Sequence, residues 1–213
     1  MIEINPSIGI KGEIYVPGDK SISHRAAFLG ALTKDGIEVS NFSPGQDCAS
    51  TLACLEALGC TVDRDEAFAT VSIKAPEGLK EPKDVLDAGN SGTTARLLLG
   101  LLSGIPNLFA VVTGDESLKR RPMGRVVKPL IAMGAKIDGR DFGERLPLAV
   151  RGRKLSGGVH ILQVASAQVK TAILLAGLSA QGATTVIEPS PTRDHTEIML
   201  EYLGVPVLKD GLK

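Results

Sequence analysis

The chain contains the same two patterns three times, and this internal repeat constrains the fold more than any other feature. The first pattern, Leu-x-x-(Leu/Met)-Gly-x-x-(Val/Ile), recurs at intervals of 75 and 70 residues, with its glycines at Gly59, Gly134 and Gly204. The second is an Ala- and Leu-rich segment that recurs at intervals of 70 and 77 residues, with central glycines at Gly30, Gly100 and Gly177. Two independent patterns in the same order indicate three equivalent structural units.

Each unit is predicted to contain two helices and several strands. The Ala- and Leu-rich segment predicts a first helix, and a β-rich run follows it (IEVSNF, NLFAVVTG and ATTVIEP). A second helix should end at the Leu-Gly motif, because glycine just past the last apolar turn stops a helix. A short strand is then expected (CTVDR, AKIDG and VPVLK), and in units one and two a partner strand (ATVSIKA and LPLAVRG). Alternating helices and strands predict an α/β (α+β) fold of three packed βαβαββ units.

The third unit is shorter than the other two. Only nine residues follow Gly204, whereas units one and two continue through a second strand after the equivalent glycine. We therefore expect the third repeat to be truncated at its C-terminus, with its final strand just beyond Lys213.

Composition excludes several classes of protein. The content of 43% hydrophobic and 23% charged residues is that of a globular protein, and Lys+Arg equals Asp+Glu at 24 each, so no net positive charge favours nucleic acid or a membrane. No apolar run approaches the ~20 residues that cross a bilayer, and the N-terminus has no secretion signal, so we expect a cytoplasmic protein. The three cysteines form no CxxC pair and are expected to be free and buried or half-buried: Cys48, Cys54 and Cys60.

Small polar residues precede the first helix of every unit, in PGDKSISHR (17–25), DAGNSGTTAR (87–96) and VASAQVK (164–170). A helix N-terminus offers unpaired N–H groups and a partial positive charge, which suit an anion. Taken alone, each segment is more often only a helix cap. Their equivalent positions in three units predict three helix starts around one anionic ligand.

Two junctions add positive charge. Lys20 and Arg25 flank the first helix start, with Ser21 and Ser23 as hydroxyl donors. In SLKRRPMGRV, three cations precede Pro122, which is expected at the first position of a helix. Such a run is usually solvated surface, but arginine also binds carboxylates and phosphates in bidentate fashion.

The last junction is SPTRDHTEIML, where Thr192 or Asp194 could cap a helix that has Glu197 in its first turn. Arg193 is less easily explained by capping. His24 and His195 are expected to be structural hydrogen-bonding groups rather than general bases. The sequence has no complete P-loop, GxGxxG, HExxH or GxSxG motif, which leaves dinucleotides, zinc and serine hydrolysis without support.

The motifs PGDKSISHRA, LDAGNSGTTAR, KRRPMGRV, ASAQVKTAILLAG and PTRDHTE together resemble the enolpyruvyl transferase family, over nearly the whole chain. The resemblance implies a two-domain protein about twice this length, each domain with three βαβαββ units around a pseudo-threefold axis. Residues 1–16 would then belong to the other domain, and 17–213 would form the N-terminal domain.

The resemblance implies transfer of the enolpyruvyl group of phosphoenolpyruvate to the 5-hydroxyl of shikimate 3-phosphate, releasing phosphate, in the shikimate pathway to chorismate and aromatic amino acids. It implies no metal or organic cofactor. By motif position, shikimate 3-phosphate would be bound by Lys20, Ser21, Arg25, Ser166, Ala167, Gln168, Ser190 and Arg193. Phosphoenolpyruvate would be bound by Lys20, Asn90, Ser91, Gly92, Arg121 and Gln168.

Some of these positions vary within the family. Lys20 would touch both substrates and is the catalytic candidate in this chain, whereas Arg193 stands where many members have Tyr. Gly92 agrees with the glyphosate-sensitive pattern.

The implied mechanism is addition followed by elimination, which needs an acid and a base. The family places these groups in the second domain, so this chain alone is expected to bind shikimate 3-phosphate weakly and not to turn over. The expected partners are the two substrates and the C-terminal domain, in a monomer.

Two alternatives remain at this stage. The sister enzyme that acts on UDP-N-acetylglucosamine typically has Lys-Asn where this chain has Lys20 and Ser21, and a catalytic Cys in the loop matching 116–121, where this chain has none. The other alternative is a non-catalytic domain that binds a phosphate ligand.

Overall fold

The structure is a computed structural model that describes residues 3, 9, 11–67 and 69–213. It confirms the α/β class and the three units. Unit one consists of α1 (Lys20–Gly30), β1 (Ile37–Val39), α2 (Gln46–Ala57), β2 (Thr61–Asp65) and β3 (Thr70–Lys74). Its sheet is antiparallel, in the order β1-β3-β2.

Units two and three each open with a strand ahead of the first helix. Unit two consists of β4 (Leu86–Asp87), α3 (Gly92–Ser103), β5 (Phe109–Thr113), α4 (Glu116–Lys119), α5 (Gly124–Ala132), β6 (Lys136–Gly139), α6 (Arg140–Gly143) and β7 (Arg145–Arg151). Unit three consists of β8 (Leu155–Ile161), α7 (Ala167–Gly177), β9 (Ala180–Ile187) and α8 (His195–Tyr202). The sheet orders are β4-β5-β7-β6 and β8-β9, and the pairs β4-β5 and β8-β9 are parallel.

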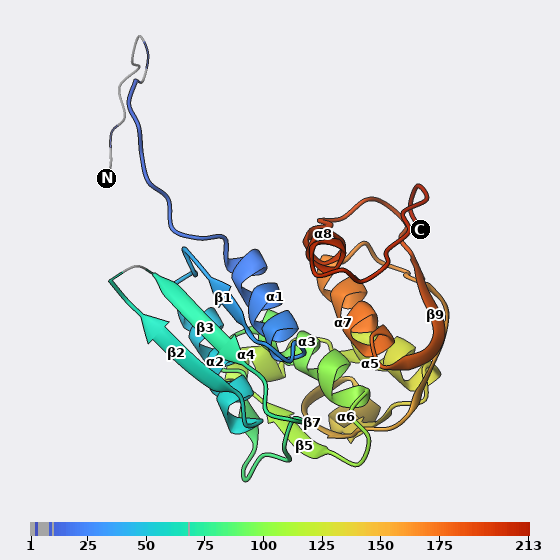
Figure 1. Cartoon of the computed structure of the whole chain (residues 1–213). Helices are drawn as coiled ribbons and strands as arrows, with labels where there is room; N and C mark the ends of the chain where they lie inside the picture. Colours follow the sequence, from blue (N-terminus) through green and yellow to red (C-terminus); the bar gives the residue numbers. More distant parts are fainter. Residues whose placement is uncertain (1–2, 4–8, 10, 68) are drawn as a thin grey trace.

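The first helices of the three units lie in the middle of the molecule. Figure 1 shows α1, α3 and α7 side by side, with the sheets of units one, two and three on the left, at the bottom and on the right. Helix α3 is buried along almost its whole length, with leucines packed on every side. A Cβ added at Gly100 would collide with the carbonyl oxygen of Ala172, so α3 and α7 pack backbone against backbone.

The repeated Leu-Gly motif ends a helix in the same way in all three units. Each motif glycine has a positive φ, 94°, 102° and 79° at Gly59, Gly134 and Gly204. The next residue donates its N–H to a carbonyl five residues back, over 3.0, 3.0 and 2.9 Å, at Cys60, Ala135 and Val205. This is the Schellman arrangement, which needs a residue that tolerates the left-handed region. The predicted role of the motif is confirmed.

The segment after the third glycine does not form the predicted strand. Residues 205–209 have no strand assignment, although the equivalent residues in units one and two form β2 and β6. Those two strands pair with β3 and β7, which follow them in the chain. Unit three has no such partner within the nine residues after Gly204, so an extended segment there gains no ladder.

The predicted start of the helix after the cationic run is also wrong. Helix α5 begins at Gly124 rather than Pro122, and the one-turn helix α4 precedes it. The N–H of Met123 donates to the carbonyl oxygen of Glu144 over 2.8 Å. This contact with the segment before β7 holds the backbone outside the helix for two more residues.

The remaining expectations concern the chain start and the cysteines. Cys48, Cys54 and Cys60 are free and buried, as predicted.

Half of residues 1–16 lie outside the described residues, so the assignment of this segment to another domain stays a prediction. Residues 11–16 run away from the body in Figure 1, with Tyr15 almost fully exposed. Within the described part, no helix has the length and apolarity to cross a bilayer.

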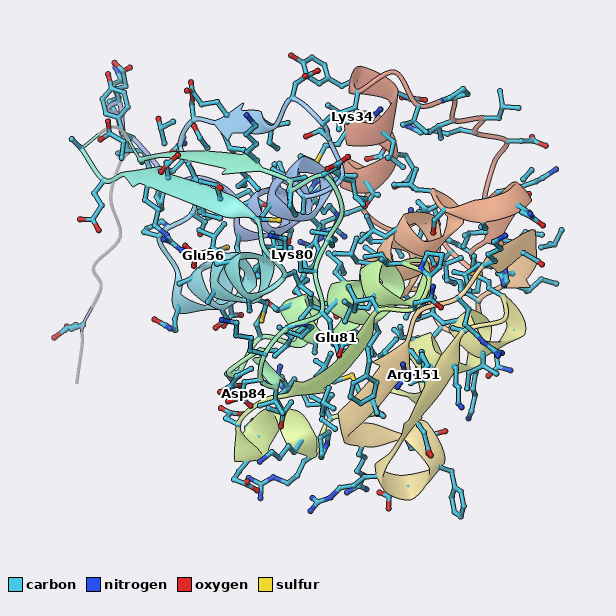
Figure 2. All side chains as sticks on the ribbon, turned by 60° about the horizontal axis from the view of Figure 1, so that its bottom comes forward. Lys34, Glu56, Lys80, Glu81, Asp84 and Arg151 are labelled. Atoms are coloured by element: carbon cyan, nitrogen blue, oxygen red, sulfur yellow. The ribbon has the colours of Figure 1, made fainter. Side chains whose placement is uncertain are left out.

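Figure 2 brings the bottom of Figure 1 forward and labels acidic and basic side chains there, among them Glu56, Lys80, Glu81, Asp84 and Arg151. These side chains have local roles. Arg64 donates both of its terminal nitrogens to Glu56 at 3.0 Å, and the Arg151 guanidinium lies 4.8 Å from the centre of the Phe109 ring. Charges of both signs lie close together here.

Candidate active site

The helix starts of the three units are joined through side chains that are far apart in the sequence. At the start of α1, Ser21 Oγ accepts a hydrogen bond from Arg193 Nη1, just ahead of α8, over 2.9 Å. Gln168 on α7 donates to Thr93 Oγ1 on α3 over 3.0 Å. Its Oε1 accepts from Arg96 Nη1 over 2.7 Å. The structure therefore brings the predicted residues Ser21, Gln168 and Arg193 to the neighbouring starts of α1, α7 and α8.

Each first helix carries the same N-terminal cap. The side chains of Asp19, Ser91 and Ser166 accept the N–H three residues on, at Ile22, Thr94 and Val169. The cap bond of Ser166 is long, at 3.4 Å, and its side chain is half-buried, whereas Ser91 is fully buried. The capping interpretation is thus correct for the three positions, and each cap occupies one of the first N–H groups, which have no partner within the helix itself.

Arg25 is predicted to bind shikimate 3-phosphate, but its guanidinium is buried and holds helices together. It donates four hydrogen bonds, to Ser21 O, Thr196 Oγ1, Ala167 O and Thr171 Oγ1, at 2.8–3.3 Å. A guanidinium has five N–H groups, so at most one remains for a ligand. Burial lowers the pKa of Arg25, and the nearby carboxylate of Glu197 opposes this. Arg25 fixes the starts of α1, α7 and α8 relative to one another.

Lys20 is an exposed cation of this group, with 53% of its side chain accessible. Its Nζ forms an ion pair with Asp47 of α2. Ser23, proposed above as a ligand donor, is buried; it donates to Asp19 O over 2.9 Å and accepts the N–H of Ser43 over 3.0 Å. That expectation was wrong, because Ser23 points back into the helix start and is used there.

A second group of polar side chains lies beside the start of α3. Arg121 Nη2 donates to Asn90 Oδ1 and Asn90 Nδ2 donates to Asp115 Oδ2, both over 2.6 Å. We call Asn90, Asp115 and Arg121 the open triad, because Asn90 and Asp115 are exposed and Arg121 is half-buried. The hydrogen bond from Asn90 lowers the pKa of Asp115, helped by the N–H of Leu118 and by Arg121.

Gly92 leaves space between two guanidinium groups. A Cβ at this position would lie 2.8 Å from Arg96 Nη1 and 3.4 Å from Arg121 Nη1. Burial lowers the pKa of Arg96, and the neighbouring Arg125 and Arg121 lower it further. The arginines therefore create a local excess of positive charge that whole-chain neutrality hides. Sequence reasoning quoted Arg96 in a motif but gave it no role.

His24 is a structural group, as predicted. Its Nδ1 lies 2.7 Å from Thr51 Oγ1, which lies 2.6 Å from Thr94 Oγ1, and Thr94 in turn donates to Ser91 Oγ over 2.7 Å. Burial lowers the pKa of His24 to about 4, although Asp47 opposes this. A neutral polar chain thus links α1, α2 and α3 beneath their starts.

The junction before α8 differs in part from the prediction. Asp194 is the N-cap residue of α8, but its side chain makes no capping bond and pairs with Lys209 at 3.5 Å. Ser190 and Arg193 are exposed. His195 Nδ1 is buried without a hydrogen bond in the described part of the chain, so its structural role stays a prediction. Across residues 3, 9, 11–67 and 69–213, no three His, Cys, Asp or Glu side chains gather as a metal site.

Three α/β units around central helices, with cations gathered at the helix starts, form the kind of domain expected of an enolpyruvyl transferase. The model of the family described as EPSP synthase (3-phosphoshikimate 1-carboxyvinyltransferase) matches residues 4–213, and the chain belongs to this family.

Individual relatives agree with this assignment. The chain is 54% identical over 203 residues to a 3-phosphoshikimate 1-carboxyvinyltransferase of Shouchella clausii and 51% identical over 201 residues to that of Bacillus subtilis. These matches cover 95% and 94% of the chain and 47% of each relative. A solved structure of EPSP synthase from Acinetobacter baumannii is similar, with a TM-score of 0.90 and 44% identity, over 94% of this chain and 45% of that one. The chain spans about half the length of the relatives it matches.

Proposed function

We propose that this chain is the N-terminal half of a 3-phosphoshikimate 1-carboxyvinyltransferase and carries most of its shikimate 3-phosphate site. The hydrogen bond between Arg193 and Ser21 is the observation that carries this proposal. It joins residues 172 apart and creates, at the starts of α1 and α8, an exposed hydroxyl and guanidinium pair suited to a phosphate. Gln168 and Ser166 lie at the start of α7, which Arg25 holds against α1.

The two substrates would lie in adjacent parts of the site. In this proposal shikimate 3-phosphate contacts Lys20, Ser21, Arg25, Ser166, Ala167, Gln168, Ser190 and Arg193. Phosphoenolpyruvate contacts Lys20, Asn90, Ser91, Gly92, Arg121 and Gln168. The space at Gly92 beside two guanidinium groups supports an anionic group at this second position. Buried Ser91 would contribute through its backbone or through the helix start that it caps.

The residues of this chain would bind and orient both substrates and neutralise their charges. Lys20 Nζ, now paired with Asp47, would turn toward the anions between the two subsites. Protonation of the enol carbon and removal of the hydroxyl proton need an acid and a base, which we assign to the C-terminal domain. We propose that the complete protein works as a cytoplasmic monomer without metal or organic cofactor.

Titration with ligands tests the proposal. The 31P NMR signal of shikimate 3-phosphate should broaden and shift when the 213-residue chain is added. Arg193→Gln should weaken this binding by roughly tenfold, which corresponds to the loss of one charge-assisted hydrogen bond. Arg64→Gln, far from the helix starts, is the control. The 31P signals of UDP-N-acetylglucosamine should not shift when the chain is added. The chain alone should release no phosphate from phosphoenolpyruvate. Preferential binding of UDP-N-acetylglucosamine would refute the proposal.

A further inference from the structure

Lys170 lies on α7 as the one charged residue of an otherwise uncharged helix, and its side chain is buried. Its Nζ is 2.7 Å from Glu188 Oε2 and 2.6 Å from Glu197 Oε1. The accessible fractions of the three side chains are 7%, 8% and 12%. We call these three residues the Lys170 clamp. Burial alone would lower the pKa of Lys170, but the hydrogen bonds that it donates to both carboxylates outweigh burial and raise this pKa.

The two glutamates stand on either side of one surface segment. Glu188 directly follows β9, and Glu197 lies in the first turn of α8. The segment between them, residues 189–196, contains Ser190 and Arg193. Thr192 within this segment donates to the second oxygen of Glu188. The ammonium group of Lys170 therefore binds the glutamates at both ends of the segment, and the bond from Thr192 to Glu188 holds the middle of the segment.

The clamp is electrostatically balanced by a residue of the substrate site. One lysine facing two carboxylates leaves an excess negative charge, and Glu197 Oε2 is buried without a hydrogen bond in the described part of the chain. Glu197 also attracts Arg25 electrostatically: burial lowers the pKa of Arg25, and the negative charge of Glu197 opposes this decrease. Arg25 is thus the second cation of the cluster, so the clamp is coupled to the start of α1.

We propose that Lys170 is a positioning residue for shikimate 3-phosphate: it holds residues 189–196 so that Arg193 reaches Ser21 at the start of α1. This role rests on the proposed function above. Lys170 is too buried to touch a ligand at the surface, and it acts through the segment that it holds. The open triad has its own hydrogen bonds and no contact with the clamp among those described, so the phosphoenolpyruvate side should not depend on Lys170.

The test uses variants that separate position from folding. Lys170→Met alone leaves two buried carboxylates unpaired and endangers folding. The combined variant Lys170→Met/Glu188→Gln/Glu197→Gln removes all three charges and should fold, as followed by circular dichroism and urea denaturation. Lys170→Arg keeps a cation that can bind two carboxylates at once. Lys128→Met, which removes the exposed ion pair between Lys128 of α5 and Glu144, is the control.

Calorimetry with shikimate 3-phosphate gives the first measurement. The folded triple variant should bind roughly tenfold more weakly than the unmodified chain, equivalent to one lost charge-assisted hydrogen bond, while Lys170→Arg and Lys128→Met stay within about threefold. Equal affinity of the triple variant and the unmodified chain would overturn the proposal. So would a folded Lys170→Arg protein that is as weak as the triple variant.

NMR of the Arg193 guanidinium gives a second measurement that needs no ligand. Its N–H signals should exchange slowly with water in the unmodified chain and rapidly in the triple variant, because the bond to Ser21 is lost. Unchanged exchange in the triple variant would overturn the positioning role. If exchange becomes rapid in the triple variant but the unmodified chain binds no shikimate 3-phosphate, the proposed function fails and the positioning role of Lys170 stands.

Discussion

The Lys170 clamp and the open triad are two polar clusters at neighbouring helix starts with nearly the same distances, 2.6–2.7 Å. They differ in their access to water. In the clamp every member is buried, whereas two members of the triad are exposed. Water and salt screen the triad, so its partners can exchange when an anion arrives. The clamp is shielded from water and fixes its segment before any ligand binds.

This difference divides the site into a preformed part and an adaptable part. In the proposed function, shikimate 3-phosphate binds to a segment, residues 189–196, that the Lys170 clamp already holds in position. Phosphoenolpyruvate meets side chains that must first release one another. Distances alone do not reveal this division, since burial decides how much each contact contributes.

The largest expected contrast is in stability. Lys170→Met should lower the free energy of unfolding by about 3–5 kcal/mol, because it leaves two buried carboxylates without their cation. Asp115→Asn, the matched change in the open triad, should lower the urea midpoint far less, since Asp115 is exposed and asparagine can still accept the N–H of Leu118. Similar midpoints for both variants would show that the buried cluster is not the stronger of the two.

Low pH should also lower the stability of the fold, through protonation of the buried residue His24. Its pKa is lowered from 6.5 to about 4 in the folded chain, so the unfolded chain binds more protons between these values. Stability should therefore fall as the pH drops from 6.5 to 4, by about 3 kcal/mol at most from this group.

Urea denaturation at a series of pH values measures this loss. His24→Gln should remove the contribution and flatten the profile in this window relative to the unmodified chain. An identical slope in both proteins would assign the acid sensitivity to other groups.

The smallest effect belongs to the open triad itself. Because the hydrogen bond from Asn90 is the main cause of the lowered pKa of Asp115, Asn90→Ala should raise this pKa toward its ordinary value. Arg121→Gln should raise it less. Carboxyl 13C NMR titration measures both, and a larger effect from Arg121→Gln would show that charge rather than hydrogen bonding dominates in the triad.

The sequence predicted the features whose physics is local. The glycine stops were correct because the Schellman bonds join residues within one motif, as at Gly59. The strand at 205–209 was wrong because a strand needs a partner that the motif does not contain. Pro122 was misplaced because the contact between Met123 and Glu144 decides where α5 begins.

The same distinction applies to the site. Lys20, Arg121 and Arg193 could be singled out because they stand at recognisable helix starts. The role of Lys170 could not, since its partners lie 18 and 27 residues away and only folding brings them together. A lysine inside the apolar run VKTAILLAG was the available signal, because a buried lysine requires a carboxylate.

The contact at Gly100 sets a limit on how this molecule can respond to a ligand. Because Gly100 has no side chain, nothing at its contact with Ala172 can change rotamer, and a slide of α3 past α7 at this point would force backbone atoms into collision. The preformed and adaptable parts of the site are therefore both attached to helices that cannot slide past one another. Adjustment within this domain is left to the side chains and the loops at the helix ends.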